Sequence, residues 1–362
     1  MLYSLKSYED YIMSYKLAVI PKIKKSLEYA SAYGSQHDCK HIHSCLERET
    51  YNIDIQYKII YEERFFKLKD KFDGVLFLGL SSRSIDFISK EEGVDIYVWA
   101  FNQCVWQQNP DTYDNVSIIF EQSTKDAVFF PKESTDIHFL PLAFQANRFK
   151  AKYHKPICDL VFNGTLYRNR REGSKNHRVE LLELLLKNDI TIVNYNGRAR
   201  KKDERELLLK LKKYKNFRVE NTFGEVKHYH KGLYSLDLPF LDTETGEDIE
   251  EKYGMSWHDL ENTIWLNHWD IFRSIGAKAN IITFDAPEIR ALGLNNNNVH
   301  FYKSTTEDLV SLSDEIMKII NKQMVKSIDG SVWHKNTYHN RWEFIIKKIR
   351  LKKGIPYRNE TI

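Results

Sequence analysis

The chain has 362 residues, of which 42% are hydrophobic and 29% charged, and its formal net charge is +4. Its four cysteines are too few for a disulfide scaffold, and no apolar run approaches the ~20 residues of a membrane span. The length favours two domains, and Met1–Lys6 lacks the layout of a secretory signal, so we expect a globular, cytoplasmic protein.

Residues 1–70 are predicted to form a helical N-terminal extension. Tyr8 to Tyr33 carries apolar residues at mixed helical spacing, and Tyr61 to Phe72 is a second amphipathic run. The region is polar overall.

The next region, residues 71–150, is predicted to be a Rossmann-like domain. Its apolar runs predict four strands, which lie at 75–80, 94–99, 116–120 and 137–142. A short helical run follows the first strand, and strands that alternate with helices indicate a mostly parallel sheet. The polar, basic segment 144–156 ends in a proline, and we interpret it as the linker.

The alternation begins again in residues 151–337, which are predicted to form a second Rossmann-like domain. Strands are expected at 160–163, 190–195, 217–220, 281–284 and 299–302, and helices near 174–187, 201–214, 260–277 and 306–321. Residues 338–362 contain a basic amphipathic helix, which we expect to return towards the N-terminal domain. Two such domains would face each other across a cleft, where the carboxyl ends of parallel strands bind ligands.

The segment Asp159–Arg171 has the composition of a phosphate site in an α/β sheet. An apolar run ends at Gly164 and Thr165, and Arg168 and Arg171 follow before a predicted helix. Glycine lets the backbone approach a ligand, a helix N-terminus offers free N–H groups, and guanidinium forks suit phosphate oxygens. An ordinary strand–turn–helix with a solvated basic turn would carry the same residues, so both interpretations stay open.

Three blocks in the second half, Asp159–Arg171, Ile192–Gly197 and Trp269–Ile289, follow one another in a familiar order. Together they resemble the C-terminal domain of GT-B glycosyltransferases, in particular spore-maturation-type enzymes and the phage DNA β-glucosyltransferase. The segments Phe139–Phe144 and Thr337–Arg341 resemble the linker entry and the start of the last helix in that family. The resemblance implies α/β architecture with two facing Rossmann-like domains, and a hexosyltransferase that moves sugar from a nucleotide diphosphate, UDP above all, to an acceptor hydroxyl.

The resemblance also assigns a donor site. It places Gly164, Thr165, Arg168 and Arg171 at the diphosphate, Asn196 and Gly197 near the base, and Asp270 and Arg273 near the ribose or a phosphate. The charges at positions 270 and 273 are exchanged relative to the family. Because these residues lie one turn apart on one helix face, they could still meet ribose and phosphate, or they could pair with each other.

Glycosyl transfer needs a base for the acceptor hydroxyl, and several residues are candidates. His268 precedes the third block, and Glu288 lies within it, just past the end of a predicted strand. Asn102 takes the place of the catalytic Asp of the phage enzyme, although an amide accepts no proton at neutral pH. Asp285 is a further candidate, whereas His138 lies in an apolar strand and is better explained as a core histidine. With arginines for the leaving group and no Asp-x-Asp tripeptide, we expect metal independence and no cofactor beyond the nucleotide-sugar co-substrate.

Three alternatives stay open. The acceptor is a glycan or, given the basic runs 201–218 and 347–353, double-stranded DNA with a hydroxymethylated base. Asn102 and the exchanged charges also fit an inactive GT-B relic that binds a glycan or acts as a scaffold. Finally, a zinc site or a polar loop would explain the alternating run His37, Cys39, His41, His43 and Cys45.

Overall fold

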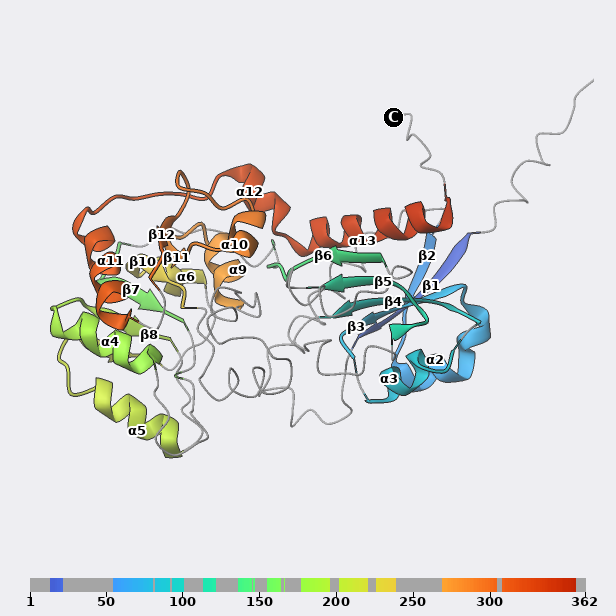
Figure 1. Ribbon diagram of the computed structural model, residues 1–362, viewed down its shortest axis with the longest axis horizontal. Coiled ribbons are helices and arrows are strands. Elements are labelled where there is room, and N and C mark those ends of the chain that lie inside the picture. The colour runs from blue at the N-terminus through green and yellow to red at the C-terminus, as the bar shows by residue number, and fades with distance from the viewer. Residues whose placement is uncertain are drawn as a thin grey trace, which may run out of the picture. The chain divides into compact units, whose positions relative to one another are not determined.

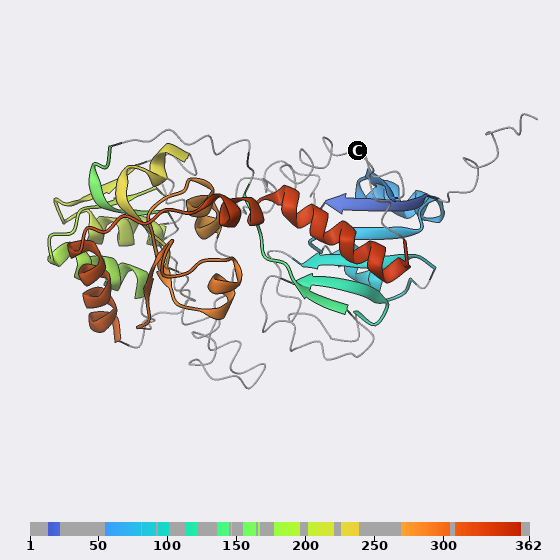
Figure 2. The same ribbon diagram turned by 90° about the horizontal axis from the view of Figure 1, so that it is seen from above.

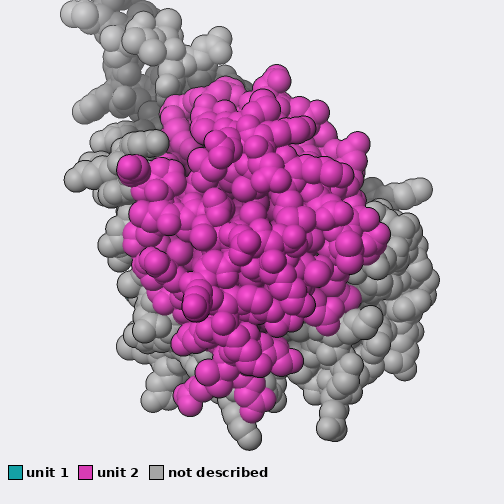
Figure 3. Space-filling view, turned by 90° about the vertical axis from the view of Figure 1, so that its left-hand side faces the viewer, with its two compact units in different colours: residues 1–141, 338–362 teal, residues 142–337 magenta. Residues whose placement is uncertain are grey.

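The structure is a computed structural model. It describes residues 14–21, 55–80, 82–91, 93–100, 113–121, 136–144, 146, 155–163, 166, 177–195, 202–220, 226–238, 269–304 and 308–355. The chain divides into two compact units, of which unit 1 comprises residues 1–141 and 338–362 and unit 2 comprises residues 142–337. Figure 3 shows one face of unit 2. No helix within the described ranges is long and apolar enough to cross a bilayer.

Unit 1 is built on a six-stranded parallel sheet with the order β2-β1-β3-β4-β5-β6 (Figure 1). Its strands are β1 (Tyr15–Pro21), β2 (Ile55–Ile59), β3 (Gly74–Leu78), β4 (Asp95–Ala100), β5 (Val116–Glu121) and β6 (Asp136–Phe139). Every residue of β3 is buried, as expected for a strand in a parallel sheet that is covered on both faces. The four strands predicted at 75–80, 94–99, 116–120 and 137–142 are confirmed as β3, β4, β5 and β6.

Helices cover both faces of this sheet. The helices α2 (Glu62–Leu68) and α3 (Ser82–Ile88) lie on one face, where Phe65 packs against Phe77 of the sheet. Helix α13 (Tyr338–Lys353) crosses the opposite face, as Figure 2 shows from above. Trp342 of α13 meets Tyr57 with ring centroids 5.1 Å apart. The last helix of the chain thus completes the core of unit 1.

The prediction that residues 1–70 are helical is wrong for two segments. Residues 15–21 and 55–59 are the strands β1 and β2, which pair in parallel with each other, and β1 also pairs with β3. In β1, Leu17 to Ile20 are all buried, so the strand reads as a continuous apolar run without the period of two that marks a half-exposed strand. Such a run is not distinguished from a helix by periodicity alone.

Unit 2 contains a second six-stranded parallel sheet, with the order β12-β11-β10-β7-β8-β9. Its strands are β7 (Cys158–Phe162), β8 (Ile192–Asn194), β9 (Phe217–Val219), β10 (Gly232–Leu236), β11 (Ile281–Phe284) and β12 (His300–Tyr302). Its helices are α4 (His177–Lys187), α5 (Lys202–Leu211), α6 (Val226–Tyr229), α9 (Trp269–Gly276), α10 (Pro287–Ala291), α11 (Leu309–Asn321) and α12 (Gly330–Lys335). The expected pair of parallel α/β domains is confirmed.

The strand order of unit 2 reverses in the middle of the sheet. From β7 the chain moves outward through β8 to β9, and it then returns to β10, which pairs with the other side of β7. It continues outward in the opposite direction through β11 to β12. This reversal is a topological switch point, where loops leave neighbouring strands in opposite directions and open a ligand crevice in α/β sheets.

Candidate functional site

Polar side chains gather where the strands of the unit 2 sheet end. Asn163 follows β7, Asn194 ends β8, and Asp237 follows β10, and each of them is at most 3% exposed. Burial of polar groups costs free energy unless they are hydrogen-bonded, so an ordinary core would not place them together. Since β7 and β10 flank the switch point, these side chains mark the candidate site of unit 2.

Asp237 is the buried acid of this edge. Thr283 of β11 donates its hydroxyl to the Asp237 carboxylate at 2.8 Å, and the Tyr302 hydroxyl donates to the Asp237 carbonyl at 3.1 Å. Arg178, in the first turn of α4, donates to the Leu238 carbonyl at 2.8 Å. Burial holds the pKa of Tyr302 well above its usual value, and Asp237 adds to this shift while Arg178 opposes it. Thus α4, β10, β11 and β12 are joined by buried polar contacts at one edge.

The predicted phosphate corner begins at this edge. β7 ends at Phe162, whose carbonyl accepts a hydrogen bond from the Asn194 amide at 3.1 Å, and Asn163 follows it directly. The helix after the corner is described from His177 onward. Gly164, Thr165, Arg168 and Arg171 lie outside the described residues. The strand and the helix that the sequence predicts on the two sides of the corner are present.

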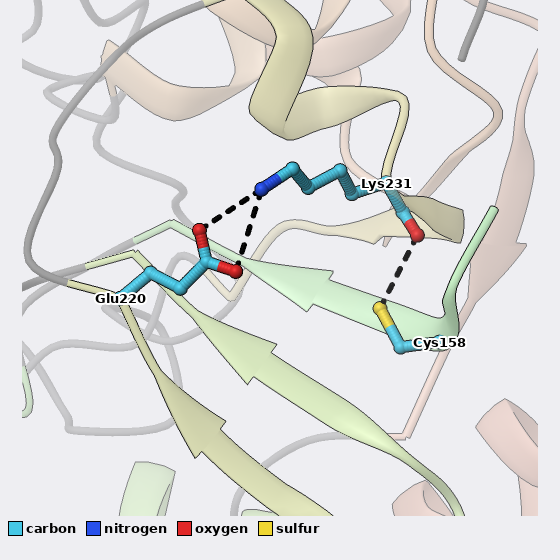
Figure 4. A network of polar contacts seen from close by, with 3 residues as sticks. All are labelled: Cys158, Glu220 and Lys231. Carbon is cyan, nitrogen blue, oxygen red and sulfur yellow. Dashed lines mark hydrogen bonds and ion pairs between the residues drawn. The ribbon is translucent and has the colours of Figure 1, made fainter. Parts of the chain in front are cut away.

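The residue after β8 belongs to a network on one face of the sheet. Tyr195 is fully buried and stacks on His228, with ring centroids 4.1 Å apart and an interplanar angle of 10°. Lys231 donates to the Glu220 carboxylate at 3.0 Å (Figure 4). The Lys231 Nζ also lies 5.6 Å from the centre of the Tyr195 ring. Asn196 and Gly197, which follow Tyr195, lie outside the described residues.

The same network includes Cys158, the first residue of β7. Its thiol donates to the Lys231 carbonyl at 3.4 Å, as Figure 4 shows. Burial, with Asp159 adding to it, raises the pKa of the Cys158 thiol to about 12, so the reactive thiolate is suppressed. We therefore interpret the contacts among Cys158, Glu220 and Lys231 as structural and not catalytic. They connect the start of β7 with the segments beside β9 and β10.

The third sequence block contributes α9, β11 and α10. Arg273 is partly buried on α9, while Ser274 next to it meets Ser235 of β10 with hydroxyl oxygens 2.8 Å apart. Asp270 lies in the first turn of α9, but its side chain is outside the described residues, as is all of His268. The contact between Ser274 and Ser235 therefore holds α9 against β10. Of the two residues whose charges are exchanged relative to the family, Asp270 and Arg273, only Arg273 has a described side chain.

Asp285 and Glu288, two predicted bases, differ in their environments after β11. Arg290 binds both carboxylate oxygens of Asp285, at 2.6 and 2.9 Å, and this hydrogen bonding lowers the pKa of Asp285. A base needs affinity for a proton, so the ion pair makes Asp285 a poor one. Glu288 lies in the first turn of α10 after Pro287 and is only 2% exposed.

One residue weighed as a candidate base, His138, belongs to unit 1. His138 lies on β6, with its Nε2 3.1 Å from an Asp136 oxygen and its ring against Phe344 of α13. Burial lowers the pKa of His138 despite the nearby Asp136. It is thus a packing residue beneath α13, as its apolar strand suggested. Asn102 lies outside the described residues.

Two buried acids were missed by the sequence analysis. Glu121 ends β5 at the carboxyl edge of the unit 1 sheet and is 1% exposed, while Asp237 has the equivalent position after β10. Burial, together with the Glu121 charge, raises the pKa of Tyr113 nearby. For Glu121 a signal was present, because this acid directly follows the apolar run 116–120 that was predicted as a strand. For Asp237 it was not recognised, because the strand β10 before it was not among the predicted strands.

Metal ligands do not gather in the described part of the chain, where no group of three His, Cys, Asp or Glu residues could hold an ion. The run from His37 to Cys45 lies outside the described residues.

No protein-family model matches the sequence, and no curated protein matches it either. Solved structures do match. Sucrose-phosphate synthase from Thermosynechococcus elongatus aligns over 94% of this chain and 100% of its own, with a TM-score of 0.58 and 9% identity. Anabaena HepE, solved with UDP and glucose, aligns over 93% and 100%, with a TM-score of 0.56 and 7% identity.

A glycosyltransferase from Rickettsia africae aligns over 95% of this chain and 99% of its own, with a TM-score of 0.57 and 12% identity. All three similar structures are GT-B glycosyltransferases. At such identities the likeness is one of fold, and the chain has the two-domain α/β architecture of GT-B proteins, with Rossmann-like sheets.

Proposed function

We propose that this protein is a glycosyltransferase that uses a nucleotide-diphosphate sugar, with UDP as the nucleotide. The fold supports this proposal, since structures with the same fold include HepE, which was solved with UDP and glucose and also with UDP-glucose. We also propose that the protein is related to the spore-maturation-type glycosyltransferases or to the phage DNA β-glucosyltransferase.

One observation carries the proposal. The switch point of the unit 2 sheet bears buried polar residues, and the sequence continues from Asn163 directly into Gly164, Thr165 and the arginines. A switch point is where α/β sheets bind nucleotides, and a glycine followed by cations is what a diphosphate requires. A solvated basic turn would have no reason to follow a buried polar edge.

The proposed chemistry follows from the charges that develop in the reaction. As the bond from the anomeric carbon to the diphosphate breaks, negative charge grows on the departing phosphate. The N–H groups of Gly164 and Thr165 and the guanidinium groups of Arg168 and Arg171 would stabilise it without a metal ion. Arg273 on α9 supplies one more cation, and Glu288 is our candidate to accept the proton of the acceptor hydroxyl.

The test measures nucleotide binding by calorimetry with UDP, ADP and GDP, each with magnesium and with EDTA. We expect UDP to bind and to be insensitive to EDTA. Arg168→Ala should weaken binding about tenfold or more, because a charge-assisted contact to phosphate is lost. Lys187→Ala, at an exposed cation in the last turn of α4, is the matched control and should leave binding unchanged. Absence of binding by every nucleotide at millimolar concentration would refute the proposal.

An inactive GT-B protein is the second candidate, and Arg273 favours it, because this arginine stands where the family has its ribose-binding acid. In that case Arg168→Ala would bind UDP as well as the wild type, and UDP-glucose would not be hydrolysed. A separate assay identifies the acceptor, by measuring transfer from a UDP-sugar to a hydroxymethylated DNA duplex and to glycan acceptors. We propose that the acceptor is a glycan.

A further inference from the structure

The segment from Arg205 to Arg218, which contains most of α5 and the start of β9, carries an unusual concentration of positive charge. Its cationic residues are Arg205, Lys210, Lys212, Lys213, Lys215 and Arg218, and all of them are exposed. Glu206 is its single acidic residue. The excess of five positive charges on this short segment is larger than the net charge of +4 of the whole chain. Most of this excess follows α5, because the helix itself also contains Asp203 and Glu204.

A leucine lies in the middle of this charged surface. Leu209 of α5 is 60% exposed, whereas Leu211 on the opposite side of the helix is fully buried. Arg205 lies one turn before Leu209, and Lys212 lies one turn after it, where the Lys212 N–H still bonds to the Leu208 carbonyl at 2.9 Å. Glu206 also lies one turn before Leu209, so the outward face of α5 presents a leucine with cations on both sides and one acid beside it.

Single exposed apolar residues are common on protein surfaces, so the surroundings decide the interpretation. Val310 of α11 is a useful comparison, because it is 61% exposed but has Asp314 one turn away instead of a cation. In Figure 1, α5 lies beneath α4 on the outside of unit 2, and within this unit it packs on α4. Its opposite face is the one that carries Leu209.

We propose that this α5 surface docks unit 2 on an anionic lipid bilayer. Lysines and arginines beside a bilayer are attracted to acidic headgroups, and a leucine between them enters the boundary of the acyl chains. A nucleic acid would use the cations but would gain little from the leucine, because phosphates and sugar edges offer it no apolar contact. With one leucine and a few cations, docking is reversible and sensitive to salt.

The test is co-sedimentation of the full chain with vesicles of phosphatidylglycerol and phosphatidylcholine, 1:1, and with vesicles of phosphatidylcholine alone. We expect binding to the anionic vesicles that is lost at high salt, and no binding to the neutral ones. Leu209→Gln should weaken binding by about tenfold. The double variant Lys212→Gln/Lys213→Gln should weaken it by about 25-fold, at about fivefold per lysine.

Two control variants separate this proposal from its alternatives. Val310→Gln removes an equally exposed apolar side chain and should leave vesicle binding unchanged, and Leu351→Gln tests the other exposed leucine among lysines, on α13. Each variant is checked for an unchanged thermal midpoint. No binding by the wild type, or loss of binding in Leu351→Gln with none in Leu209→Gln, would overturn the proposal. So would tighter binding of duplex DNA that depends on the lysines and not on Leu209.

Discussion

The bond between Thr283 and Asp237 allows a sharp test of the buried polar edge of unit 2. The two side chains are 0% and 2% exposed, and the hydroxyl donates to the carboxylate at 2.8 Å. Thr283→Val keeps the shape of the side chain, so it opens no cavity and removes only the donor. A hydrogen bond to a buried charged group contributes about 1.5–3 kcal/mol, and we expect this loss in the free energy of unfolding.

For a domain the size of unit 2, that loss corresponds to a fall in the thermal midpoint of about 3–12 °C. Urea unfolding gives the free energy, and hydrogen exchange of peptides from β10 and β11 shows whether the loss is local to this edge. The matched control is Thr337→Val, where a buried hydroxyl donates at 2.9 Å to a neutral carbonyl, that of His334. We expect about 1 kcal/mol there. A loss in Thr283→Val no larger than in the control would refute the reasoning.

Three further predictions concern packing, an ion pair and pH. Gly232→Ala would bring a Cβ within 2.7 Å of backbone atoms of β7 and β10, so urea unfolding should show a loss of about 3 kcal/mol, whereas Gly330→Ala, with open space around it, should show none. Lys353→Met removes an ion pair of 2.6 Å with Asp95. Because the pair is about one-third exposed, the free energy of unfolding should fall by about 1 kcal/mol, and less at high salt. If the pair anchors the end of α13, limited proteolysis there should be faster in the variant. Burial lowers the pKa of His300 to about 4, so the unfolded chain takes up a proton below pH 6.5 while the folded chain does not. Stability should therefore fall as the pH drops from 6.5 to 4, by about 2–3 kcal/mol, and urea midpoints of His300→Gln should lack this part of the slope.

Much of the secondary structure follows from the sequence alone. The strand β11 and the helix α13 have the bounds that their apolar patterns predict, because each pattern has the length and period of its element. The segment β1 was misassigned because a strand buried on both faces has no alternation to show. The segment β2 was also misassigned, although its burial does alternate along the strand. Local pattern therefore predicts an element best where its length excludes the alternative.

The site divides in the same way. The sequence by itself determined that a glycine and a cluster of arginines follow an apolar strand, because these are neighbours along the chain. Only the tertiary structure placed β10 beside β7, which brought the buried Asp237 to the edge where Asn163 lies. Only the tertiary structure, too, paired Asp285 with Arg290. Strand order and burial depend on contacts between residues far apart in the chain, and no local pattern of residues encodes them.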